Sequence, residues 1–303
     1  MPPWITSLVE LLALLSVVPV LATLRVVLRG TTLTTAWTWL AAALAGAIIS
    51  AATPFLLDAS AIGLSDQLWY GTGILLLCPP IAVLGAKRPM SRVWSVFILL
   101  PLILVFGWPA ASAWSAGWRN AAWVLEEPVF VGYALVLVMG AGNYIGTRGT
   151  VSSILYAIAA LLIVAPLCPP LASRLPSATL CRLSATVCLA VAASFGAWRR
   201  PSARQSSQPA TSSGFKFDEV WRDFRNTFGI VWSRRIQDRF NELSRSSNWG
   251  VQLTPQGFVG PVEPAVPPNQ RAPDTLVAAE AALRWLLRRF VDPAWIDRKC
   301  TLK

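Results

Sequence analysis

The chain has 303 residues, of which 54% are hydrophobic and only 14% carry a charged side chain. Soluble globular proteins have about 25% charged residues, so this composition excludes that class and predicts a membrane protein. Histidine is absent, which excludes histidine-ligated haem, histidine-containing zinc or copper sites, and catalytic pairs that use histidine as a base.

Charge is unevenly distributed along the chain. Residues 199–303 hold seventeen of the 26 Lys and Arg side chains and ten of the 15 Asp and Glu side chains. This part therefore contributes +7 to the net charge of +11, and residues 1–198 contribute +4. The distribution predicts a lipid-embedded body followed by a basic, water-exposed C-terminal region.

Seven apolar segments approach the length of about 20 residues that a helix needs to cross a bilayer. They are residues 4–28, 35–57, 69–86, 92–108, 122–145, 151–171 and 178–198. The N-terminal sequence MPPWITSLVELL has no basic n-region and no small-residue cleavage site. We therefore expect the first segment to be a retained span rather than a signal peptide.

The third segment contains Cys78, Pro79 and Pro80 near its middle. Two prolines remove backbone hydrogen bonds that lipid cannot replace, so we expect this helix to be kinked and packed against its neighbours. A re-entrant segment is the alternative interpretation.

The short loops predict the orientation, because Lys and Arg accumulate on the cytoplasmic side of a membrane. Basic residues follow the first, third, fifth and seventh segments: Arg25, Arg29, Lys87, Arg88, Arg92, Arg148, Arg199 and Arg200. The opposite loops carry Asp58, Asp66, Arg119, Glu126, Glu127 and Arg174. This pattern predicts a bacterial-type inner-membrane protein whose N-terminus is outside and whose C-terminus is cytoplasmic.

Glu126 and Glu127 begin the fifth segment and are followed by Pro128, which suits the first turn of a helix. Acidic groups there also face the positive end of the helix dipole. The favoured interpretation of this acidic pair is a charged collar at the outer membrane surface. A proton or cation site is the alternative if one of the two carboxylates faces a cavity.

Glu10 and Arg182 are charged groups inside predicted spans. Glu10 lies six residues beyond Trp4, about 9 Å deeper at 1.5 Å per residue, and Arg182 lies at a similar depth in the seventh span. An unpaired charge at the bilayer centre costs about 2.5–3.5 kcal/mol. A structural ion pair between the two, snorkelling of each side chain to the surface, and a substrate or proton site are the three hypotheses.

Asn143 and Tyr144 close the fifth segment within the sequence MGAGNYIG. Small residues allow helices to approach closely, and Asn can donate hydrogen bonds between helices. We therefore interpret this stretch as a packing element rather than a binding site.

The five cysteines, at positions 78, 168, 181, 188 and 300, show no CxxC spacing and predict neither a disulfide framework nor a metal site. Cys168 and Cys181 bracket a short loop, so a disulfide between them is an alternative to free thiols in apolar surroundings.

The C-terminal region begins with a Ser- and Pro-rich stretch, residues 199–214, which predicts a flexible linker. An amphipathic helix with a bend near Gly229 is expected to follow. Its aromatic side is the candidate face for a protein partner or the membrane surface: Phe217, Trp221, Phe224, Phe228 and Trp232. A small hairpin, a proline-rich segment and a final helix over 275–291 complete the region, 215–303.

Two arrangements of this region are compatible with the pattern: a small folded domain, or amphipathic helices lying on the inner leaflet. We expect a compact unit docked against the membrane. Nucleic-acid binding is disfavoured, because basic residues alternate with acidic ones and no recognised module is present.

The fold class that we predict is therefore an all-α polytopic membrane protein with about seven transmembrane helices and a small, mainly helical C-terminal region. No motif for catalysis, a cofactor or a metal is present. The leading hypothesis is a non-catalytic accessory or scaffold subunit whose tail, rich in Trp, Phe and Arg, binds a protein partner or the membrane surface. A small-solute secondary transporter and a lipid-modifying enzyme are the alternatives.

Overall fold

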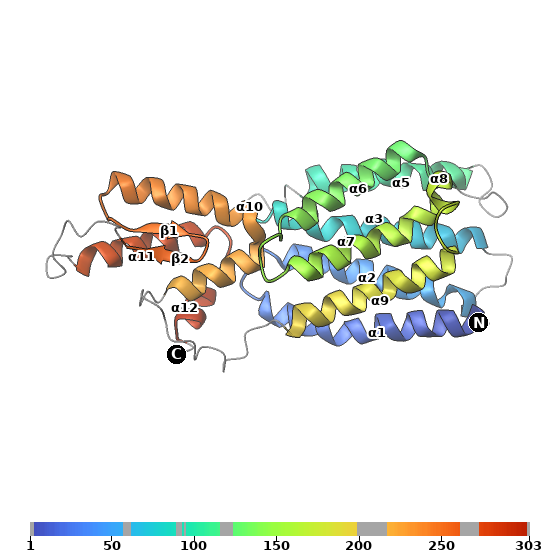
Figure 1. Ribbon diagram of the computed structural model, residues 1–303, viewed down its shortest axis with the longest axis horizontal. Coiled ribbons are helices and arrows are strands. Elements are labelled where there is room, and N and C mark those ends of the chain that lie inside the picture. The colour runs from blue at the N-terminus through green and yellow to red at the C-terminus, as the bar shows by residue number, and fades with distance from the viewer. Residues whose placement is uncertain are drawn as a thin grey trace.

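The computed structural model describes residues 3–56, 62–88, 93, 95–115, 124–198, 217–260 and 273–301. It shows an elongated, mainly helical molecule (Figure 1). The helices before residue 199 form a bundle, and the later residues form a smaller unit beyond one end of it. We call the end of the bundle that meets the C-terminal unit the docked end, and the opposite end the free end.

The bundle contains helices of unequal length. They are α1 (Pro3–Val27), α2 (Thr34–Leu56), α3 (Ile62–Leu84), the π-helical turn η2 (Ser95–Leu99), α5 (Leu100–Ser115), α6 (Glu127–Gly142), α7 (Thr150–Val164), the short turns η3 (Ala165–Leu167) and α8 (Pro169–Ala172), and α9 (Ala178–Trp198). Within the described part of the chain, five are long and apolar enough to cross a membrane: α1, α2, α3, α7 extended by η3, and α9. The body is therefore that of an all-α membrane protein.

The helices α5 and α6 each have 16 residues. A helix of that length covers about 24 Å, against a hydrocarbon core of about 30 Å. The predicted count of seven crossings therefore remains a prediction. The fifth predicted span, 122–145, is longer than α6, which ends where the chain turns at Asn143.

The helix α3 is the most buried of the five long helices. Of its apolar segment, 67% is buried, against 22–33% for the other four. It begins at Ile62, seven residues before the predicted start at Trp69, because the polar turn that includes Asp66 is helical. The sequence prediction assigned that turn to a loop.

The two prolines in α3 do not end the helix. Pro80 has no N–H, which frees the carbonyl of Leu76 four residues earlier. The hydroxyl of Tyr156 in α7 donates to this carbonyl at 2.7 Å. Pro80 also packs against Gly140 of α6, where a Cβ would overlap the proline ring. The third predicted span is thus a continuous helix long enough to cross the bilayer and packed against its neighbours.

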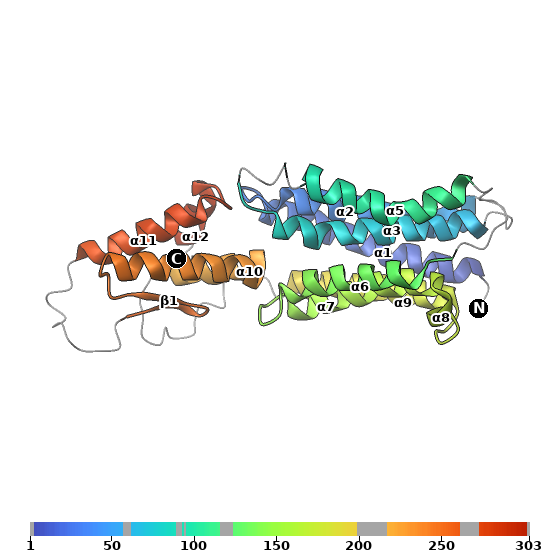
Figure 2. The ribbon, with the colours of Figure 1, turned by 90° about the horizontal axis from the view of Figure 1, so that it is seen from above.

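The five long helices contact one another in a closed order. The helix α1 packs on α2, α2 on α3, α3 on α7, α7 on α9, and α9 on α1. The helix α5 packs against α3 of this ring, and α6 packs against both α3 and α7. Viewed from above, α2, α3 and α5 lie on one side and α6, α7 and α9 on the other, with α1 between them (Figure 2).

The C-terminal unit is built around one long helix. It comprises α10 (Phe217–Ser246), β1 (Gln252–Thr254), β2 (Gly257–Val259), α11 (Pro273–Leu287) and α12 (Pro293–Thr301). The helix α10 contacts both strands and both later helices. The strands form an antiparallel hairpin in which Leu253 lies opposite Phe258. The helix bends at Gly229, where the backbone leaves the helical region (φ 81°, ψ −175°).

Some predicted features lie outside the described residues. These are the linker 199–214, residues 261–272 of the proline-rich segment, and the charged loop residues Asp58, Arg92 and Arg119.

Candidate functional site

Three charged side chains lie inside the ring near the free end of the bundle. Arg182 of α9 forms an ion pair with Asp66 of α3, and its guanidinium lies 5.8 Å from the centre of the Trp69 ring. Glu10 of α1 is only 4% exposed and lies within electrostatic range of Arg182. Because α3 and α9 are not neighbours in the ring, the Arg182–Asp66 pair crosses its interior. We call these three residues the charged cluster.

The charged cluster places Glu10 and Arg182 near each other, as the ion-pair hypothesis requires, but the partner of Arg182 is Asp66. The Oε1 atom of Glu10 and the Nε atom of Arg182 are both buried and make no hydrogen bond with any residue that the structure describes. Sequence reasoning missed Asp66, since it assigned the residue to an outer loop. A signal was available: Asp66 precedes Trp69 by three residues, one helical turn, in a stretch without proline or glycine.

A cavity of about 480 Å³ lies between the helices of the bundle, toward its docked end. All five long helices and α6 line it with mainly aliphatic side chains. The lining includes Leu21 and Leu24 of α1, Ala43 and Leu44 of α2, Leu76 and Val83 of α3, Leu137 and Ala141 of α6, Ala157 of α7, and Leu189 and Ala192 of α9. The lining residues lie mainly in the halves of the helices nearer the docked end, and Ala47 lies just past the middle of α2. Glu10, Asp66 and Arg182 do not line this cavity.

The cavity changes from apolar to polar at the docked end. Polar lining there comes from Arg148, Ser152 and Ser153 of the body and from Asp223, Asn226, Thr227 and Lys299 of the C-terminal unit. The Nζ atom of Lys299 lies 2.6 Å from Asp223 Oδ2 and joins α12 to α10. The C-terminal unit therefore forms the polar floor of a cavity whose walls are membrane helices.

The C-terminal unit is attached to three loops of the bundle, which together we call the junction. In the loop after α1, Thr32 N–H donates to the Phe290 carbonyl at 2.9 Å, and Asp292 N–H donates to the Gly30 carbonyl at 2.7 Å. In the loop after α3, Arg88 N–H donates to the Arg289 carbonyl at 2.9 Å. These are the loops whose basic residues predicted the orientation. They converge on one end of the molecule.

The third part of the junction joins Asn143, at the end of α6, to the bend in α10. The Asn143 carbonyl accepts a hydrogen bond from Ile230 N–H at 2.7 Å, and its side-chain oxygen accepts one from Val231 N–H at 3.0 Å. Its side-chain amide donates to the Phe228 carbonyl at 3.1 Å. Asn143 thus satisfies backbone groups that the bend at Gly229 exposes. The sequence analysis assigned Asn143 to packing between helices, but its partner element was not predicted.

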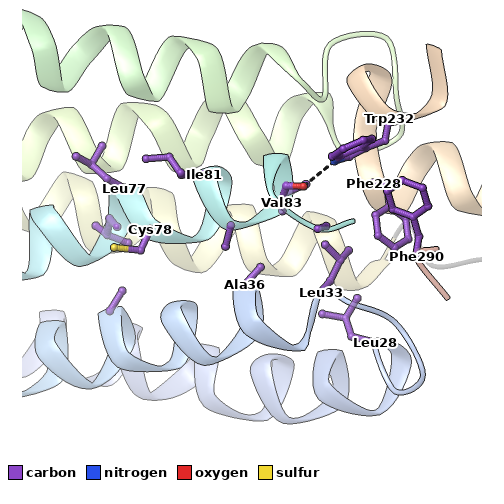
Figure 3. Packing of buried hydrophobic residues seen from close by; sticks show 14 of the residues in the cluster. Leu28, Leu33, Ala36, Leu77, Cys78, Ile81, Val83, Phe228, Trp232 and Phe290 are labelled. Carbon is purple, nitrogen blue, oxygen red and sulfur yellow. Dashed lines mark hydrogen bonds between the residues drawn. The ribbon is translucent and has the colours of Figure 1, made fainter. Parts of the chain in front are cut away.

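Aromatic residues close the junction. The indole N–H of Trp232 donates to the carbonyl of Val83, the penultimate residue of α3, at 2.9 Å (Figure 3). The Phe290 ring packs edge-on against Phe224, Phe228 and Trp232 at centroid distances of 5.4, 5.5 and 4.9 Å. One cluster of buried side chains therefore extends from the bundle into the C-terminal unit.

The predicted aromatic face of α10 is not an exposed surface. Phe217, Trp221, Phe224, Phe228 and Trp232 are between 0 and 7% exposed. Trp221 donates its indole N–H to the Thr254 carbonyl at 2.7 Å, so the hairpin covers part of this face. The expectation that these five side chains meet a partner or lipid is corrected: they form the core of the C-terminal unit and its contact with the bundle.

The acidic pair lies where the sequence predicted, at the start of α6. Glu126 is the N-cap residue and Glu127 the first helical residue, and both are exposed. Neither lines the cavity. Cys168 and Cys181 are both buried free thiols.

No protein-family model, curated protein or solved structure matches this chain. The function is therefore inferred from the charged cluster, the cavity and the junction.

Proposed function

We propose that this protein is a non-catalytic accessory or scaffold subunit of a membrane assembly. In this proposal, the bundle spans the bacterial inner membrane with its N-terminus outside, and the C-terminal unit is held at the cytoplasmic surface. The observation that carries the proposal is the junction. Backbone hydrogen bonds from three loops fix the unit in one orientation, which a flexible tethered tail would not require.

A scaffold also needs an accessible surface, and α11 offers one. Val277, Ala281 and Trp285 recur every four residues and are exposed, with Val277 at 64% and Trp285 at 52%. Arg289 stacks on Trp285, with its guanidinium 5.0 Å from the ring centre. Trp and Arg are the residue types that contribute most to protein interfaces. We therefore assign the partner surface to this face of α11.

The proposal is tested by purifying the full-length protein from its native membranes in mild detergent. We expect one partner at fixed stoichiometry, lost in Trp285→Ala and retained in Val259→Ala, which removes an exposed apolar side chain on β2. A partner retained by both variants, or none with either, contradicts the assignment. If Trp285→Ala instead reduces binding to protein-free anionic vesicles, the face of α11 binds the membrane surface rather than a protein.

The charged cluster favours one other candidate function, a small-solute secondary transporter. Buried ionisable groups inside membrane helices commonly mark ion or substrate pathways, and the Oε1 atom of Glu10 has no hydrogen-bond partner among the described residues. The test uses liposomes that contain only this protein and a trapped pH indicator, exposed to a panel of organic solutes. Solute-dependent proton uptake that is lost in Glu10→Gln supports transport. Its absence with every solute supports the scaffold.

A further inference from the structure

The dimensions of the cavity match one leaflet of a bilayer. Its lining residues on α1 and the residue that follows it extend from Val17 to Leu28, which is about 17 Å at a rise of 1.5 Å per residue. Half of a hydrocarbon core of about 30 Å is about 15 Å. With the docked end at a membrane surface, the cavity would therefore extend about as deep as one leaflet, and its lining does not reach the charged cluster.

The walls of the cavity determine which occupant it suits. Its lining is mainly aliphatic, and a single unbranched hydrocarbon chain can lie along such an apolar space. Water does not suit the apolar part, because water needs polar partners that the aliphatic walls lack.

The polar end of the cavity carries more positive than negative charge. Arg148 and Lys299 line it together with one acid, Asp223. A further cation, Arg25, lies 4.9 Å above the ring of Trp37, which also lines the cavity. Ser152 and the amide of Asn226 are at the same end, whereas the hydroxyls of Ser153 and Thr227 donate to the carbonyls of Thr150 and Asp223. The excess of cations suits a phosphate group, which accepts hydrogen bonds and carries negative charge.

We propose that the cavity binds one acyl chain of an anionic phospholipid, with the lipid phosphate next to Arg148 and Lys299. The acyl chain lies inside the ring, and the headgroup contacts both the loop after α6 and the helices α10 and α12. Binding therefore links the anionic lipid content of the membrane to the attachment of the C-terminal unit. This inference does not depend on the scaffold proposal, since the cavity is described without reference to any protein partner.

The test uses the full-length protein in nanodiscs that contain a trace of phosphatidylglycerol with a photoactivatable group near the end of one acyl chain. After illumination, we expect labelled peptides from the inner faces of α1, α2 and α9. Phosphatidylcholine with the same chain should label them about fivefold less, because a basic group near a membrane surface contributes about 1 kcal/mol toward an anionic lipid. Lys299→Gln should reduce the difference between the two lipids.

A matched pair of variants tests where the acyl chain of the lipid lies. Ala157→Phe places a ring in the cavity and should abolish labelling of the inner faces, whereas Ala45→Phe, at an exposed position of α2 outside the cavity, should leave it unchanged. If Ala157→Phe does not fold, competition by unlabelled lipid against the wild-type protein replaces it, and phosphatidylglycerol should compete at a lower concentration than phosphatidylcholine. Labelling confined to outward-facing residues, or equal labelling by the two lipids, overturns the proposal.

Discussion

A single methyl group at position 229 should detach the C-terminal unit from the bundle. A Cβ at this position would lie 2.5 Å from both the Cγ atom and the carbonyl oxygen of Asn143, far inside van der Waals contact. The backbone there (φ 81°, ψ −175°) is in a region that is essentially restricted to glycine. Gly229→Ala therefore costs about 1–3 kcal/mol in backbone strain. It also displaces Asn143, whose three hydrogen bonds to α10 contribute about 0.5–1.5 kcal/mol each.

Together these effects lower the free energy of opening the junction by about 3–7 kcal/mol. Hydrogen exchange at the amides of Ile230 and Val231, measured by mass spectrometry on the detergent-solubilised protein, reports the free energy of opening the junction. A loss of about 3 kcal/mol corresponds to exchange more than 100-fold faster. Gly142→Ala is the control: it adds a methyl group next to Asn143, where a Cβ meets nothing within 4 Å. Equal exchange in the two variants would refute the role of Asn143 and Gly229.

Three further predictions concern the bundle and are checked by thermal unfolding in detergent. Arg182→Gln leaves Asp66, whose side chain is 29% exposed, without its cation and should destabilise the protein by about 2–3 kcal/mol, less than the loss of a fully buried pair. Glu10→Gln should change stability by less than about 1 kcal/mol, because the Oε1 atom of Glu10 has no hydrogen bond to lose within the described part of the chain. An equal loss of stability in both variants would show that Arg182 pairs mainly with Glu10. Tyr156→Phe removes the hydroxyl that donates to the Leu76 carbonyl and should cost about 1–3 kcal/mol. An unchanged unfolding temperature for that variant would show that the break at Pro80 needs no compensation.

The charged cluster shows how far local sequence patterns can identify a site. Glu10 and Arg182 stand out because charge is rare in apolar spans, and depth along each helix predicts that they lie near each other. The choice of Asp66 as partner depends on which helices face each other across the ring. Helical spacing within one segment contains no information about that arrangement.

The aromatic face of α10 illustrates a second limit. The spacing of Phe217, Trp221, Phe224 and Phe228 predicts an amphipathic helix, and the structure confirms the helix and its bend at Gly229. Periodicity shows that one side of a helix is apolar, but not what covers that side. Lipid, a protein partner and the chain's own later residues all satisfy the same pattern, and here Phe290 and the β-hairpin cover it.

The sequence by itself determines that the protein is a helical membrane protein with a basic C-terminal region, because hydrophobic length and charge distribution act locally along the chain. Only the tertiary structure decides that five long helices form a ring around a cavity, that Asn143 meets Gly229, and that the C-terminal unit closes one end of the ring. Each of these features depends on contacts between residues far apart in sequence. Such contacts form, and stabilise the fold, only when the helices pack against one another.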